Sequence, residues 1–226
     1  RRVLFRSKGE PVPIAEQVGT SVVGGSDFRA SNNGVLVYST RAAQVGELAE
    51  LDRAGRLVRL LDCPPSALSP MLSPDDRRVT VRAIDPQTRS RNVWILDRDR
   101  GISTRFTFEP SNENYPLWSP DGRRIAYWSD APGASGVVAK QLTGSGETEL
   151  LAPLADEVAL KDWSADGSTI FLDTFGATGS DIATLAVSGA HKPKPFLNGA
   201  FNEFSGRLSP DGRYLAYVSD ESGRGD

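Results

Sequence analysis

The chain is built from short apolar runs that alternate with polar, turn-forming clusters. In two well-defined runs, Ile125–Trp128 and Leu215–Val218, apolar residues follow one another with no polar residue between them. A short run of this kind, bounded by turn residues, predicts a β-strand that is covered on both faces. The pattern therefore favours an all-β fold whose strands are buried between sheets.

The apolar runs follow one turn motif that returns with a nearly constant period. The aligned segments are Leu72–Val81, Trp118–Tyr127, Trp163–Leu172 and Leu208–Tyr217, with a shorter copy at Ala30–Tyr38. Their serines lie at positions 31, 73, 119, 164 and 209, so that the steps are 42, 46, 45 and 45 residues. A second marker, Leu-Asp-Arg at 51–53 and 96–98, keeps the same 45-residue spacing. Two markers in phase indicate a repeat protein.

The turn motif has the residues of a tight hairpin. Proline sets φ at about −65°, aspartate accepts a bond from the backbone two residues on, and glycine adopts the left-handed conformation. We assign this structural role to Ser73, Pro74, Asp75, Ser119, Pro120, Asp121, Gly122, Asp166, Gly167, Ser209, Pro210, Asp211 and Gly212. Asp76 replaces the glycine in one copy and Ala165 replaces the proline in another, and both are compatible with a turn. The motif predicts a positive φ at Gly122, Gly167 and Gly212.

Each repeat has room for about four short strands, which is the composition of a β-propeller blade. In the first repeat we predict strands at Glu47–Leu51 and Leu57–Leu61. A helix is the alternative for the segment Arg41–Asp62, because its apolar residues recur at helical spacing. Two glycines interrupt the segment, which favours strands.

The predicted fold is an all-β β-propeller fragment of about five four-stranded blades, with incomplete blades at the ends. Residues 25–226 form the propeller repeats, and residues 1–24 form an N-terminal segment outside the repeat. Residues 1–7 resemble translated sequencing-adapter sequence and are excluded from the fold prediction, whereas the rest of the segment fits the end of a preceding blade. Because residue 226 falls inside the repeat pattern, we expect the chain to be a piece of a longer protein.

These residues resemble the WD-like propeller repeats of bacterial TolB-like proteins, and more closely the propeller that follows the kinase domain in bacterial serine/threonine protein kinases. The runs that carry the resemblance are Asp85–Arg89, Asn92–Asp97, Ser103–Phe108, Lys194–Leu197 and Phe201–Arg224. The resemblance implies a non-catalytic sensor or protein-binding platform outside the cytoplasm, tethered through a membrane-anchored parent kinase. Two alternatives stay open: a TolB-like periplasmic interaction protein, and the gating propeller of a prolyl-oligopeptidase-like serine peptidase. Flanking sequence would discriminate among the three.

Residues suited to catalysis are scarce. The chain has one histidine and one cysteine, and it lacks the kinase catalytic loop, the Gly-x-Ser-x-Gly elbow and the phosphate-binding glycine loop. We interpret His191 as a solvated loop residue and Cys63 as a partly buried thiol. The turn aspartates fall one per repeat, which favours turn capping over a shared metal ion. We therefore predict no catalytic residue, no cofactor and no metal site.

The expected partner is a protein or peptide, and a small-molecule ligand is left open. A net charge of −3 gives no bulk attraction to nucleic acid or anionic lipid. No apolar run approaches the roughly 18 residues that a membrane helix needs. Propellers bind through loops around one rim, and the candidate contact residues in such loops are Asn114, Tyr115 and Asn202.

Overall fold

The computed structural model describes residues 3–5, 12–15, 28–30, 35–39, 48–143, 146–176, 179–189 and 191–223. All of the regular structure in these ranges is β-strand, and the chain divides into two compact units, residues 1–108 and 109–226. The all-β class predicted from the apolar pattern is therefore confirmed.

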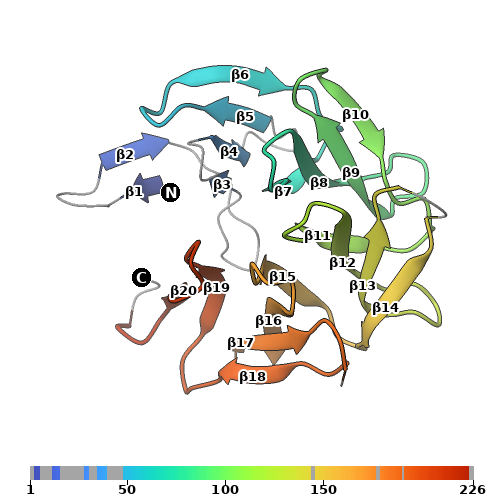
Figure 1. The fold of residues 1–226 in the computed structure, drawn as a ribbon, viewed down its shortest axis with the longest axis vertical. Coiled ribbons are helices and arrows are strands. Elements are labelled where there is room, and N and C mark those ends of the chain that lie inside the picture. Colours follow the sequence, from blue (N-terminus) through green and yellow to red (C-terminus); the bar gives the residue numbers. More distant parts are fainter. Residues whose placement is uncertain are drawn as a thin grey trace. The chain divides into compact units, whose positions relative to one another are not determined.

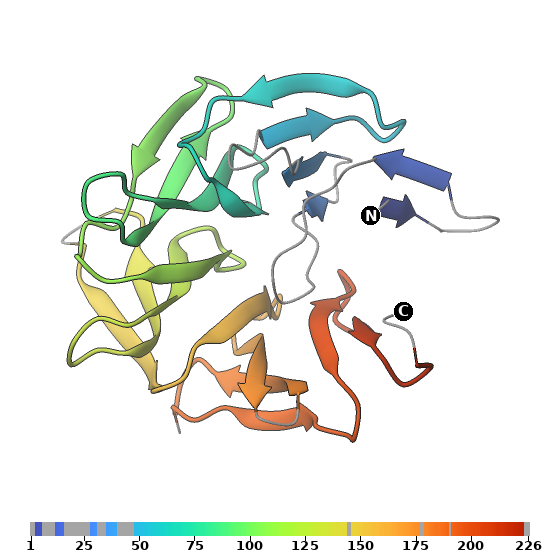
Figure 2. The ribbon, with the colours of Figure 1, turned by 180° about the vertical axis from the view of Figure 1, so that it is seen from behind.

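The first unit contains one two-stranded and two four-stranded antiparallel sheets (Figures 1 and 2). The two-stranded sheet pairs β1 (Val3–Phe5) with β2 (Val12–Ala15). The next sheet has the order β3 (Phe28–Ala30), β4 (Leu36–Ser39), β5 (Leu48–Leu51), β6 (Leu57–Leu61). The last has the order β7 (Leu68–Leu72), β8 (Arg78–Ile84), β9 (Arg91–Asp97), β10 (Ile102–Arg105).

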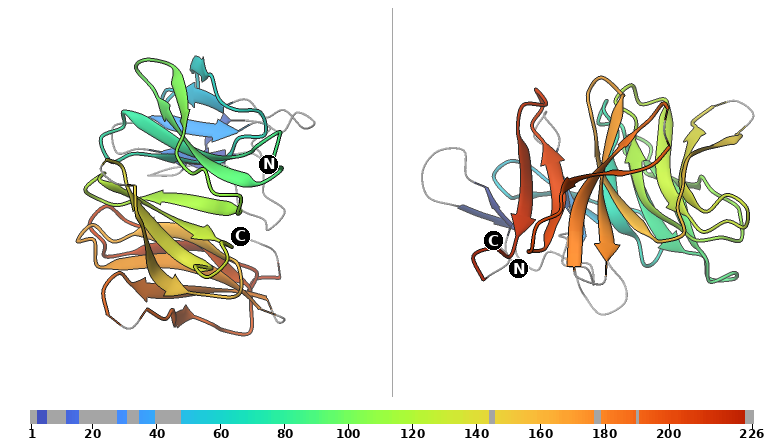
Figure 3. Two further views of the ribbon diagram at one scale, coloured as in Figure 1. Left: turned by 90° about the vertical axis from the view of Figure 1, so that its right-hand side faces the viewer. Right: turned by 90° about the horizontal axis from the view of Figure 1, so that it is seen from below.

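The second unit contains two four-stranded sheets and a hairpin. One sheet has the order β11 (Glu113–Trp118), β12 (Arg124–Ser129), β13 (Gly136–Gln141), β14 (Thr148–Pro153). The other has the order β15 (Val158–Trp163), β16 (Thr169–Gly176), β17 (Gly179–Ala186), β18 (Lys194–Leu197). The hairpin pairs β19 (Glu203–Leu208) with β20 (Leu215–Ser219). Strand β19 packs on β15, β16 and β17, and Figure 3 shows the hairpin beside that sheet.

Four four-stranded sheets thus follow one another along the chain, each traced from one strand to its neighbour, with a two-stranded sheet before and after them. The predicted strands around residues 47–61 are confirmed as β5 and β6, and no helix forms in the described part of Arg41–Asp62. Residues 3–5, part of the N-terminal segment excluded from the fold prediction, form β1 and pair with β2 in a sheet. The first copy of the turn, residues 31–34, lies outside the described residues.

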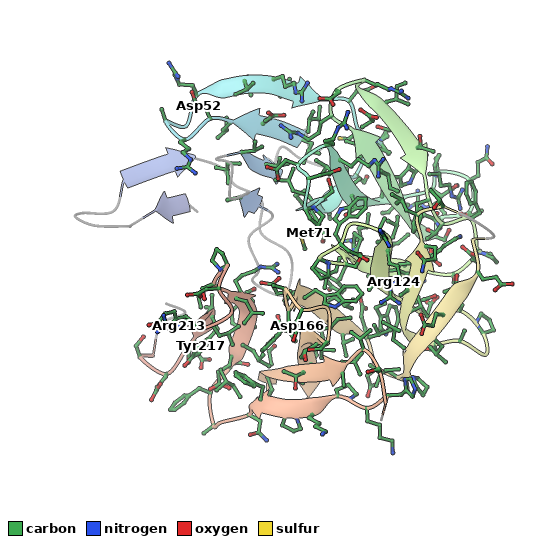
Figure 4. All side chains as sticks on the ribbon, viewed as in Figure 1. Asp52, Met71, Arg124, Asp166, Arg213 and Tyr217 are labelled. Atoms are coloured by element: carbon green, nitrogen blue, oxygen red, sulfur yellow. The ribbon has the colours of Figure 1, made fainter. Side chains whose placement is uncertain are left out.

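The turns after β7, β11, β15 and β19 have one geometry. In each, the serine N–H donates to the carbonyl five residues on, as from Ser119 to Arg124 at 2.9 Å. Gly122, Gly167 and Gly212 have φ values of 68°, 76° and 68°, which confirms the predicted conformation. Asp76 takes a φ of 58° at the equivalent position. Figure 4 shows Asp166 at the turn between β15 and β16.

Strand β12 is buried on both faces, as its apolar run predicts: Ile125 and Ala126 are 0% exposed and Tyr127 is 2% exposed. The same prediction is wrong for β20, where the equivalent Tyr217 is 44% exposed. The reason is that β20 has only β19 as a neighbour in the described hairpin, whereas β12 lies between β11 and β13. In the first unit the core lies between the two four-stranded sheets and includes Val37, Leu48, Val79, Val81 and Leu96.

Candidate binding surface

The turn aspartates accept hydrogen bonds from their own turns. Asp121 accepts a bond from Ser119 Oγ at 2.6 Å and from the Arg123 N–H at 3.0 Å. The other three turns repeat this arrangement, and the hydrogen bonds hold the pKa of each carboxyl below its ordinary value, to about 2 for Asp166. Within the described ranges, no three histidine, cysteine or acidic side chains come together as metal ligands.

Two of the three candidate contact residues lie in a strand. Asn114 belongs to β11, is 2% exposed, and donates from Nδ2 to Glu157 Oε1 at 2.8 Å. Tyr115 follows it in a β-bulge with a φ of 54°, and the Lys161 ammonium lies 5.8 Å from its ring centroid. The prediction that these two residues lie in a loop is therefore wrong. Strand β11 already begins at Glu113, although its first residues are polar. Asn202 does precede its strand and is half-buried.

Asn202 belongs to a clasp that closes the open end of its hairpin. Its N–H donates to Asp220 Oδ1 at 2.8 Å and its Nδ2 donates to Asp220 Oδ2 at 2.6 Å. Asn112 and Asp130 make the same two bonds in the β11–β12 hairpin, both at 2.7 Å. In each pair the asparagine lies seven residues before the turn serine and the aspartate eleven residues after it. The clasp thus recurs in these two hairpins and fixes where their strands enter and leave the sheet.

The intervening hairpin, β15–β16, has no clasp. Its equivalent positions hold Glu157 and Phe175, which cannot form the two bonds. Both residues instead line a pocket of about 170 Å³ together with Leu154, Ala155, Asp156, Val158, Thr174 and Pro193. In the sheet β7–β10 the equivalent residues are Ser66 and Ile84, so the combination of a missing clasp with a carboxylate occurs at β15–β16.

The connector from β14 to β15, which forms one side of the pocket, is held at three successive points. The Leu154 N–H donates to the Ser135 carbonyl at 3.1 Å. The indole Nε1 of Trp128 donates to the Asp156 carbonyl at 3.2 Å. Glu157 accepts the bond from Asn114. The pocket is therefore formed by a connector whose backbone position is fixed before any ligand arrives.

Besides lacking the clasp, the hairpin β15–β16 departs from the repeat in a second way, because it contains a buried ionic cluster. Lys161 Nζ lies 3.1 Å from Asp173 Oδ2, and their side chains are 15% and 2% exposed. Asp173 also accepts the Ser205 N–H at 2.9 Å, and Asp162 accepts the Leu208 N–H at 2.8 Å. Burial raises the pKa of the Asp173 carboxyl, and the Lys161 ammonium opposes this. The cluster joins β19 to the preceding sheet.

Comparison of equivalent positions could have revealed both departures from sequence alone. The positions equivalent to Lys161 hold Pro70, Pro116 and Gly206. Those equivalent to Glu157 in the flanking hairpins hold Asn112 and Asn202. A charged residue where the other copies are neutral is the signal, because a structural repeat needs no charge there.

The histidine and the cysteine are not among the residues that line this pocket. His191 is exposed, and its Nδ1 is 2.6 Å from the Leu151 carbonyl. Cys63 is half-buried at the edge of the first unit's core. No helix in the described residues is long and apolar enough to cross a membrane.

The family model of the PD40 TolB β-propeller domain matches residues 60–226. The chain belongs to this family. The match spans the repeats whose turns and clasps are described above, and it confirms the predicted TolB-like resemblance and the propeller fold.

Individual relatives are more distant. The uncharacterized peptidase YuxL of Bacillus subtilis is 30% identical over 121 residues, which cover 52% of this chain and 18% of that protein. The crystal structure of TolB from Acinetobacter baumannii superimposes with a TM-score of 0.69 at 17% identity, covering 96% of this chain and 53% of that one. Putative TolB from Agrobacterium tumefaciens gives a TM-score of 0.65 at 20% identity, covering 92% and 80%. These structures share the fold, and the association with a kinase stays a prediction.

Proposed function

We propose that this chain is a binding module that captures an extended segment of a partner protein, and that it turns over no substrate itself. The observation that carries the proposal is the pocket at β15–β16, whose connector is fixed by hydrogen bonds from Ser135, Trp128 and Asn114. A fixed recess on a rigid β scaffold suits binding, because little conformational entropy is lost when a partner docks.

The chemistry of the described side chains supports binding over catalysis. A nucleophile is activated by a base within hydrogen-bond reach, and a general base must itself have an accessible atom that is free to accept a proton. The carboxylates of the turns and clasps accept hydrogen bonds from the protein's own backbone and side chains. The buried Asp173 is occupied by Lys161 and Ser205.

We propose that the module acts outside the cytoplasm as part of a longer protein. TolB-like interaction proteins are the first candidate for the parent, because TolB structures share the fold over almost the whole chain. A serine peptidase is the second candidate, because the curated relative with 30% identity is named a peptidase. In that parent the propeller would admit extended peptide substrates to a separate catalytic domain. The kinase-tethered sensor is a third parent with the same binding role.

Selection from an unbiased peptide library tests the binding role. The purified chain, immobilised, should enrich a shared sequence motif, and synthetic peptides with that motif should bind the chain in solution with saturation. Incubation of those peptides with the chain should leave them intact by mass spectrometry. Failure to enrich any binding peptide would overturn the proposal. Cleavage that a point substitution within residues 25–226 abolishes would overturn the claim that the chain is not catalytic.

A further inference from the structure

The pocket at β15–β16 contains two carboxylates that form no ion pair among the described residues. Asp156 is exposed and Glu157 is half-buried, and neither carboxylate lies within ion-pair distance of a lysine or arginine in the described part of the chain. Lys192 and Lys194 flank the pocket residue Pro193, are exposed, and likewise form no ion pair with these two carboxylates.

Apart from Thr174, the remaining residues that line the pocket are apolar. Leu154, Val158 and Pro193 contribute aliphatic surface, and Phe175 contributes an aromatic ring. Long basic side chains have the complementary composition, since an aliphatic stem packs on apolar surface while the charged end pairs with a carboxylate. A cation over an aromatic face gains further stabilisation.

The repeat itself indicates that these residues do more than complete the hairpin. At the two positions that form the clasp in the flanking hairpins β11–β12 and β19–β20, an asparagine and an aspartate are replaced by Glu157 and Phe175. This exchange forgoes two hydrogen bonds and leaves a carboxylate without a cation, which is unfavourable for folding alone. Glu157 Oε1 is nevertheless positioned by Asn114, so its carboxylate is held where an incoming donor could reach the other oxygen.

We infer that this pocket recognises a lysine or arginine side chain of the partner, with Asp156 and Glu157 as the acceptors and Phe175 as the platform. The inference rests on the proposed function and adds the chemistry of one partner residue to it. Arginine is the better fit, because its planar guanidinium can pair with a carboxylate and stack on the phenylalanine ring at once.

Matched peptides test the charge requirement. Acetyl-Gly-Arg-Gly-amide and its citrulline counterpart differ in charge and hardly in shape, and NMR titration of the chain follows the signals of Val158 and Phe175. We expect saturable shifts with the arginine peptide, weakening as salt rises, and affinity at least about fivefold lower for citrulline. Equal shifts with both peptides, or no shifts with either, would overturn the inference.

Two variants separate recognition from folding. Glu157→Gln keeps the side-chain size and the acceptor for Asn114, and it should lower affinity for the arginine peptide, while Glu147→Gln at the exposed end of the β13–β14 turn should leave affinity unchanged. The double change Glu157→Asn with Phe175→Asp rebuilds the clasp residues of the neighbouring hairpins, and it should raise the melting temperature while abolishing binding. Full binding by either Glu157 variant would contradict the assignment. Library peptides that bind without basic residues would leave the proposed function standing and refute this pocket chemistry.

Discussion

Gly136, at the start of β13, lies close to the backbone where the pocket connector begins. This close approach is possible because glycine has no side chain. Gly136 has a φ of 140°, and a Cβ placed on it would lie 2.0 Å from the Ala152 carbonyl oxygen and 2.7 Å from the Leu154 nitrogen. Both atoms belong to the backbone, so no side-chain rotation can relieve the overlap. The Gly136→Ala variant must therefore displace the chain around Leu154, where the connector begins.

The matched control is Gly133, three residues earlier in the β12–β13 turn. It has a φ of 81°, but a Cβ on it would meet nothing within 4 Å. Gly133→Ala should cost about 1–2 kcal/mol, the strain of an L side chain in the left-handed region. Gly136→Ala carries at least this strain, because a φ of 140° lies farther from the left-handed region, and an overpacking cost of about 1–3 kcal/mol in addition.

Thermal unfolding followed by circular dichroism measures the difference. For a chain of this size, an extra 1–3 kcal/mol lowers the melting temperature by about 2–12 °C relative to Gly133→Ala. Gly136→Ala should also lose affinity for the arginine peptide, because Leu154 moves. Equal melting temperatures for the two variants would refute the close approach of the connector to β13.

Three further predictions concern hydrogen bonds and pH. Trp163 Nε1 donates to the Gly167 carbonyl at 3.0 Å, whereas Trp94 Nε1 is buried and finds no acceptor among the described residues. In urea unfolding, Trp163→Phe should therefore lose about 1–3 kcal/mol and Trp94→Phe clearly less, and the reverse order would contradict this assignment. Asn112→Ala removes the Nδ2 bond to Asp130, keeps the backbone bond, and should cost about 1 kcal/mol, with a double-mutant cycle against Asp130→Ala showing coupling. The folded-state pKa of Asp166, about 2, lies below its ordinary value of 3.8, so its stabilisation is present above pH 3.8 and is lost as the pH falls towards 2. The fall in melting temperature between pH 4 and 2 should be smaller in Asp166→Asn, and an unchanged fall would refute the role of this carboxylate.

The fold could be predicted from the sequence because its turns are determined locally. A serine, an aspartate and a residue at positive φ close each hairpin within six residues, and Ser164 to Thr169 closes even with Ala165 in place of proline. The even spacing of these turns then required sheets of about four short strands, which is what β7–β10, β11–β14 and β15–β18 are.

The candidate contact residues could not be placed in the same way, because their surroundings come from distant parts of the chain. Asn114 is a polar residue two positions before Pro116, a pattern that resembles a loop, but it lies in β11 and Glu157 from the next repeat provides its partner. Glu113 is 1% exposed, and its carboxylate accepts a bond from Ser111 Oγ at 2.5 Å. Lys161 and Asp173 compensate each other in the core, and a pattern of apolar and polar residues cannot show such a pairing.

Hydrogen–deuterium exchange of the chain with and without a library-selected peptide tests the central claim most directly. The account predicts slower exchange on binding in the connector at 154–158 and at 174–175, with the turns at 119–124 and 164–169 unchanged. It also predicts that the peptide is recovered uncleaved. Protection confined to those turns, or no protection at saturating peptide, would contradict the assignment of this surface as the binding site.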